Sequence, residues 1–171
     1  MLHHPASPPA PDRVLLVADW NVDPQAVVDA ARSRHQDAGM ALLVPARLHG
    51  LDWVGDPYAS VPCAQLQLDR ITELAGQAGL TFARAGVGDP EPLAAICDAL
   101  AAWPVDHLMV CGTRGRIGVP RPFDLRTRAR RLSVSATVEW VDLPAASSAA
   151  RRRTWLSLRG GHCALEQPHA A

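Results

Sequence analysis

The sequence predicts a single α/β domain built on a doubly wound, five-stranded parallel sheet of the flavodoxin-like or Rossmann-like kind. Short apolar runs recur along the chain without alternating, which is typical of strands buried on both faces. Segments with a helical spacing of apolar residues separate these runs, so that strand and helix alternate. The length of 171 residues, 48% of them hydrophobic, provides for one sizeable core with a surplus at the ends.

Five segments have the length and composition of strands. The first, second and fourth are continuous apolar runs, whereas the apolar residues of the third alternate, so we expect the third strand nearer the edge of the sheet. Right-handed crossovers should join successive parallel strands. In chain order the segments are 14–18, 41–44, 80–85, 108–111 and 136–141.

Four helices are predicted between these strands. Asp23-Pro24 and Asp89-Pro90 each combine an N-cap residue with a proline in the first turn, so the two aspartates are predicted to be helix caps rather than catalytic acids. The 45–60 connection after the second strand is long enough to be functional and could form a lid. The helical segments run over about 24–39, 62–76, 90–103 and 124–133.

The two ends of the chain differ from its middle in composition. Residues 1–12 are rich in Pro, Ala and His and are predicted to be a disordered tail, which leaves 13–144 as the domain. Residues 145–171 form an Ala/Arg-rich tail, where disorder is favoured over a short amphipathic helix around Trp155. No stretch has the apolar length of a membrane span or the apolar region of a signal peptide, so we expect a soluble, cytoplasmic protein.

Charge and residue types exclude several functions. The formal net charge is zero, so no general attraction to nucleic acid or to an anionic membrane is expected. All 17 basic residues are arginines, which excludes a Schiff-base lysine and the lysine of a phosphate loop. The 4 cysteines are far apart, and no Ser/His/Asp or Cys/His arrangement stands out, so neither a zinc site nor nucleophilic catalysis is predicted. We therefore expect a protein that is not an enzyme.

The candidate ligand site lies at the predicted carboxyl edge of the sheet. Asp19 ends the first strand, where its carboxylate either hydrogen-bonds a ligand or caps the amides of its own turn. The fourth strand is expected to break at Gly112 into a turn with Gly115 and Gly118, which allows a ligand to approach the backbone but also suits a plain loop.

Seven arginines accompany these glycines within residues 114–131, and Asp124 is the single acid among them. This local positive charge indicates a phosphate or another small anionic ligand near the junction of strand and helix. The alternative is a solvated helix face, which accounts better for the arginines after Leu125 than for those before it. The arginines are Arg114, Arg116, Arg121, Arg126, Arg128, Arg130 and Arg131.

From Arg13 to Leu143 the chain resembles the universal stress protein (UspA-like) family. Residues 13–19 are similar to the family's first strand with its terminal aspartate. Residues 88–90 are similar to its Gly-Asp-Pro turn before a helix, and residues 106–115 to its fourth strand running into Gly-(Ser/Thr)-Arg-Gly. The resemblance implies a universal stress protein-like, five-stranded parallel α/β fold.

The resemblance also implies a ligand and a partner. Many members of that family bind ATP through the first aspartate, a residue that ends the second strand, and the glycine motif G-x2-G-x9-G-(S/T). Carried over by position, these contacts fall on Asp19, Val44, Gly112 and Gly115. Family members commonly dimerise, which implies a homodimer through the predicted fifth strand, 136–141.

The second half of the glycine motif is absent. Leu125-Arg126 stand where Gly-(Ser/Thr) is expected, so both the glycine and the hydroxyl are missing. Asp124 would also place a carboxylate at the helix N-terminus that a triphosphate needs. Arg114, Arg121 and Arg126 can offset part of this loss, so the resemblance implies weak binding of ATP or another adenine nucleotide, or binding of a smaller anion.

The leading hypothesis is therefore a stress-response or regulatory protein that acts by binding a ligand or by association. One alternative is a dimeric interaction module without nucleotide binding. A second alternative is a weak nucleotide-dependent enzyme, such as an ATPase.

Overall fold

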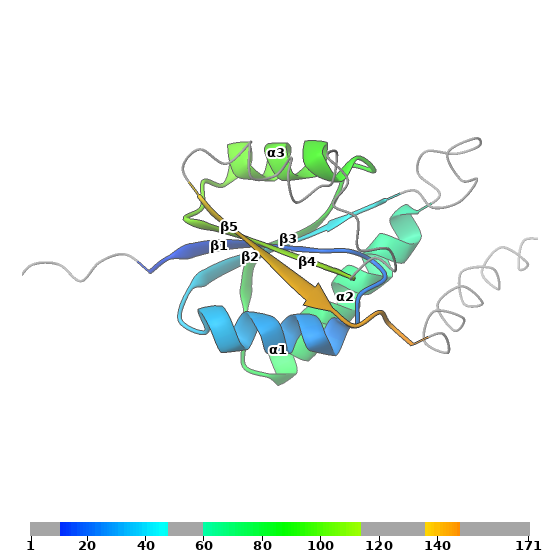
Figure 1. Cartoon of the computed structure of the whole chain (residues 1–171), viewed down its shortest axis with the longest axis horizontal. Coiled ribbons are helices and arrows are strands. Elements are labelled where there is room, and N and C mark those ends of the chain that lie inside the picture. Colours follow the sequence, from blue (N-terminus) through cyan, green and yellow to red (C-terminus); the bar gives the residue numbers. More distant parts are fainter. Residues whose placement is uncertain (1–10, 48–59, 114–135, 148–171) are drawn as a thin grey trace, which may run out of the picture.

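The computed structural model describes residues 11–47, 60–113 and 136–147, which form a layered α/β structure (Figure 1). Five parallel strands make one sheet in the order β3-β2-β1-β4-β5, with α1 and α2 on one face and α3 on the other. The predicted doubly wound, five-stranded parallel sheet is confirmed. The elements are β1 (Arg13–Ala18), α1 (Pro24–His35), β2 (Gly39–Pro45), α2 (Val61–Gln77), β3 (Phe82–Gly88), α3 (Pro92–Ala102), β4 (His107–Thr113) and β5 (Thr137–Leu143).

Four of the five strands run further toward their carboxyl ends than the sequence predicts, and the extension is longest in β3 and bears on the site in β4. β3 lies at an edge of the sheet, as its alternating apolar residues predict, and continues to Gly88. β4 continues through Gly112 to Thr113, because these two residues pair with Asp142 and Leu143 of β5. The predicted break of the fourth strand at Gly112 is therefore wrong, and Gly112 is part of the sheet.

One of the two predicted helix caps is confirmed. Asp23 Oδ1 accepts from two backbone N–H groups in the first turn of α1, at 2.9 and 3.4 Å. Asp89 does not cap α3, because the helix starts at Pro92, the later of two prolines, and Glu91 is its cap. Glu91 Oε2 accepts from Ala94 N at 2.7 Å, whereas Asp89 Oδ1 accepts from Glu91 N at 2.8 Å in the turn before the helix.

The core lies on both faces of the sheet. β1 is 0–2% exposed at every position after Arg13, which explains why its sequence is apolar without alternation. Leu16 packs with α1 and α2 on one face, and Leu15 packs with α3 on the other. Because both faces of β1 are covered, a ligand can reach this strand at its ends alone.

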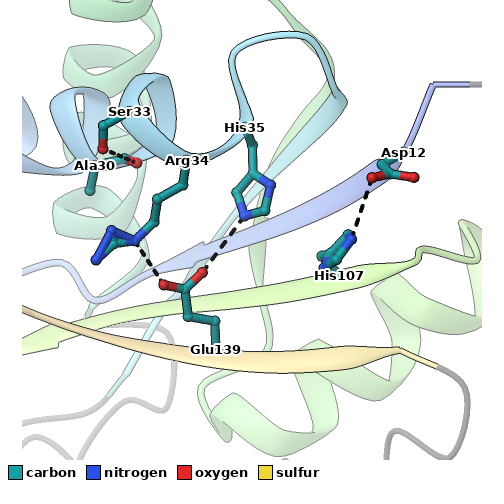
Figure 2. Close-up of polar contacts among 7 residues, drawn as sticks. All are labelled: Asp12, Ala30, Ser33, Arg34, His35, His107 and Glu139. Carbon is teal, nitrogen blue, oxygen red and sulfur yellow. Dashed lines mark hydrogen bonds and ion pairs between the residues drawn. The ribbon is translucent and has the colours of Figure 1, made fainter.

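A polar cluster ties α1 to β4 and β5 near the amino edge of the sheet (Figure 2). Glu139 of β5 accepts from Arg34 Nε at 2.7 Å and lies 3.7 Å from His35 Nε2. The ring centroids of His35 and His107 are 5.3 Å apart, and His107 Nε2 lies 3.6 Å from Asp12 Oδ2. These contacts hold the last turn of α1 against the edge strand β5.

The paired structure continues past residue 144, the predicted end of the domain. Val22 and Ala145 form an antiparallel bridge, and Ala146 N donates to Asn21 O at 2.8 Å. The segment after β5 therefore packs beside the loop that follows β1. The rest of the predicted tails (1–10 and 148–171), most of the predicted lid (48–59) and the predicted fourth helix (124–133) lie outside the described residues.

Candidate ligand site at the carboxyl edge

The strand order reverses between β1 and β4, because the chain moves outward from β1 to β2 and β3 and then places β4 and β5 on the other side. In open parallel sheets, ligands bind outside the carboxyl ends of the strands at such a reversal. Asp19 directly follows β1 at this point, and its backbone N–H donates to Cys111 O of β4 at 3.1 Å. The structure thus places Asp19 beside the last residues of β4.

The two carboxylate oxygens of Asp19 have different surroundings. Oδ2 accepts from Arg47 Nη1 at 3.2 Å, which forms an ion pair across the ends of β1 and β2. Oδ1 is buried and has no hydrogen-bond partner among the described residues. No backbone amide in the described ranges donates to this carboxylate, so the geometry does not support turn capping, the alternative role of Asp19. The side chain is 18% exposed, which leaves it within reach of a ligand.

The loop from Asp19 to Asp23 is held from several sides. Asp23 N donates to the carbonyl that follows β5 at 2.9 Å, and the buried Gln67 of α2 donates to Val22 O at 2.9 Å. Asn21 Oδ1 is a second buried acceptor without a partner in the part of the chain that the structure describes. Two such acceptor atoms on one loop are suited to receive N–H or O–H groups.

Arg47 is a residue of this site that the sequence reasoning missed. It lies two residues after β2, and its side chain is 51% exposed. Carboxyl ends of neighbouring parallel strands meet at one edge of a sheet, so a basic residue after the second strand falls beside an acid after the first. A basic residue shortly after the second predicted strand, together with an acid directly after the first, is therefore the sequence signal that points to Arg47.

The other predicted site residues have different positions. Val44 is 0% exposed in β2, where it pairs with Val87 of β3 and presents no surface to a ligand. A β-carbon added at Gly112 would lie 2.7 Å from Trp140 Cζ2, so packing against the indole accounts for this glycine without a ligand. The remaining predicted residues, which lie outside the described ranges, are Arg114, Gly115 and Arg126.

Cys111 lies in the buried part of β4 and is not suited to nucleophilic chemistry. Burial, together with the negative charge of Glu139, raises the pKa of this thiol from 9.0 to about 12. The thiol is therefore protonated at neutral pH. Within the described residues, no three His, Cys, Asp or Glu side chains are placed to share a metal ion. No described helix is long and apolar enough to span a membrane.

The fold and the site together define a doubly wound parallel α/β protein with a carboxylate paired with an arginine at the carboxyl edge of its sheet. No family model matches the sequence, and no curated protein matches it. Twelve chains from solved structures match this chain, and they include a member of the family that the sequence resembles.

The first of these structures is a universal stress protein in complex with cAMP. It shows 13% identity and a TM-score of 0.47, over 78% of this chain and 99% of that chain. The second is a probable methyltransferase from Bordetella pertussis Tohama I, with 25% identity and a TM-score of 0.29, over 81% of this chain and 75% of that chain. Likenesses of this degree assign neither a ligand nor an activity.

Proposed function

We propose that the protein binds a small ligand at the carboxyl edge between β1 and β4, with an adenine nucleotide as the leading candidate, and that it acts through binding rather than catalysis. The observation that carries the proposal is Asp19 Oδ1, a buried acceptor without a donor in the described structure. Leaving a buried acceptor without a donor costs about 1–3 kcal/mol. A ligand N–H or O–H placed at this oxygen would offset that cost.

The acceptors of the site favour a ligand with several donors. Asp19 Oδ1 and Asn21 Oδ1 are suited to neighbouring hydroxyl or amino groups, which a nucleoside carries on its ribose and its base. The choice of adenine, and of a regulatory or stress-response role, comes from the resemblance of the sequence to the UspA-like family. Leu125-Arg126, in place of Gly-(Ser/Thr), argues for weak binding of the phosphates.

Asp19→Ala should weaken the binding of adenosine, AMP and ATP by about ten- to hundredfold, because a hydrogen bond to a charged group contributes about 1.5–3 kcal/mol. Titration calorimetry measures these affinities. The fluorescence of Trp20, which directly follows Asp19, gives an independent readout. Asp69→Ala is the matched control, because Asp69 lies exposed on α2 and its carboxylate accepts from Gln65 at 2.8 Å.

The proposal is wrong if the wild-type protein binds none of these compounds at millimolar concentration. It is also wrong if Asp19→Ala binds them as tightly as the wild type does. Hydrolysis of ATP by the wild type that is lost in Asp19→Ala would instead favour the alternative of a weak enzyme.

Association through β5 is a second candidate function, favoured by the position of this strand. β5 is the last strand on its side of the described sheet. Thr137 N donates to Asp106 O at 2.8 Å, so the alternating N–H groups of Val138 and Trp140 point away from β4. An edge of this kind can pair with the same edge of a second copy of the chain.

Val138→Pro should convert such a dimer to monomer, because proline removes an outward N–H and leaves the hydrogen bonds to β4 in place. Sedimentation at several protein concentrations measures the change in mass. Val138→Ala is the control for the lost side chain, which packs against the α3 face of the sheet, and it should remain a dimer. A monomeric wild-type protein, or a dimer that survives in Val138→Pro, would rule out association through this edge.

A further inference from the structure

Arg47 is the one basic residue that follows a strand at the carboxyl edge within the described part of the chain. Its Nη1 lies 3.2 Å from Asp19 Oδ2, and its side chain is 51% exposed against 18% for that of Asp19. At this edge, the other described charged residues at the last two positions of a strand, or directly after one, are acids, namely Asp89 after β3 and Asp142 in β5. Without Arg47, the described part of this edge would therefore be acidic.

We propose that Arg47 determines the class of ligand, because it neutralises the carboxylate of Asp19 and so lets the site accept an anion, which favours a nucleotide over a nucleoside. This inference rests on the proposed function of the same site. A phosphate within about 5 Å of a carboxylate that has no counterion would lose about tenfold or more in affinity, through repulsion at the effective dielectric constants of a protein surface. The positive charge of Arg47, which is paired with the carboxylate of Asp19, offsets that repulsion.

The chemistry of the side chain also suits direct contact with a phosphate. A guanidinium carries five N–H donors in a planar fork, which matches the geometry of carboxylate and phosphate oxygens. The half-exposed position of Arg47 keeps the group accessible from the solvent side of the edge. The ion pair with Asp19 fixes the guanidinium next to the buried acceptor that the proposed ligand would engage.

The test is a titration of adenosine, AMP and inorganic pyrophosphate into the wild type and into Arg47→Ala and Arg47→Gln. Arg13→Ala is the matched control, because Arg13 begins β1 at the opposite edge, pairs with Asp106 at 4.0 Å and is 46% exposed. Both Arg47 variants should bind AMP about tenfold more weakly and adenosine at least as tightly as the wild type, whereas Arg13→Ala should behave as the wild type. Raised salt should reduce the wild-type preference for AMP.

The outcomes separate this inference from the proposed function. Equal ratios of AMP to adenosine affinity in the wild type and in both Arg47 variants overturn the role of Arg47, even if nucleotide binding is intact. Pyrophosphate binding that depends on Arg47, without binding of adenosine or AMP, supports anion selection by Arg47 and contradicts the proposed nucleotide ligand. Binding of none of the three compounds overturns both.

Discussion

Gly112→Ala is expected to lower the free energy of unfolding by about 2–3 kcal/mol, the usual cost of overpacking a well-filled site. The new β-carbon would lie 2.7 Å from Cζ2 and 3.2 Å from Cη2 of Trp140. The indole is restrained, because its Nε1 donates to Asp142 Oδ1 at 2.9 Å and its ring packs against the core on the α3 side. Urea denaturation, with the midpoint and slope fitted together, measures the change.

Two further variants show whether the cost arises from this contact. Gly86→Ala is the matched control in another strand, because a β-carbon at Gly86 meets no atom within 4 Å, and it should leave stability nearly unchanged. Trp140→Leu should reduce the cost of Gly112→Ala in a double-mutant cycle, since the obstructing ring is removed. If the two substitutions are additive, the indole does not explain the glycine, and the ligand-binding interpretation of Gly112 regains support.

Alkaline pH is expected to destabilise the protein by about 1.4 kcal/mol per pH unit above pH 9, approaching about 4 kcal/mol near pH 12, through Cys111. Burial raises the pKa of this thiol from 9.0 to about 12 in the folded state. The folded protein therefore keeps the proton between these pH values, whereas the unfolded chain releases it. The contribution of the protonated Cys111 thiol to the free energy of unfolding is fully present below pH 9. It is lost as the pH rises from 9 through about 12.

Comparison of variants isolates this effect from other titrating groups. Cys111→Ala should lose the extra alkaline slope, so that its stability curve and that of the wild type converge as the pH rises. Cys97→Ala is the control, because Cys97 is exposed on α3, and it should keep the wild-type pH dependence. Urea denaturation at pH 8, 9 and 10 measures the slopes. Parallel curves for the wild type and Cys111→Ala would contradict the prediction.

The architecture could be predicted because the central strands are buried on both faces, and such strands have a recognisable sequence. Residues 14–18 and 108–111 contain no polar side chain, and this pattern indicates a parallel sheet. The end of β4 could not be predicted in the same way. Gly112 continues the strand because it pairs with Asp142 and lies under Trp140, and both contacts join residues far apart in sequence.

The site could be predicted only where it depends on one segment of the chain, and not where it depends on contacts between segments far apart in sequence. The position of Asp19 follows from the end of a single strand, but its ion pair with Arg47 depends on β1 and β2 lying side by side. Val44 was carried over by position from a family resemblance, which does not reveal that the residue is fully buried here. The ligand contacts of Arg114, Gly115 and Arg126 stay predictions, because these residues lie outside the described ranges.

The attachment of the 19–23 loop has an entropic consequence. The loop backbone is bonded to β4 at Cys111, to α2 through Gln67 and to the segment after β5 at Pro144. Ordering a flexible backbone costs on the order of 1–2 kcal/mol per residue. In this protein the cost falls on folding and not on binding, because the loop is fixed by contacts within the domain. A ligand that reaches Asp19 would therefore lose little affinity to the ordering of this loop, which lowers the number of hydrogen bonds that binding requires.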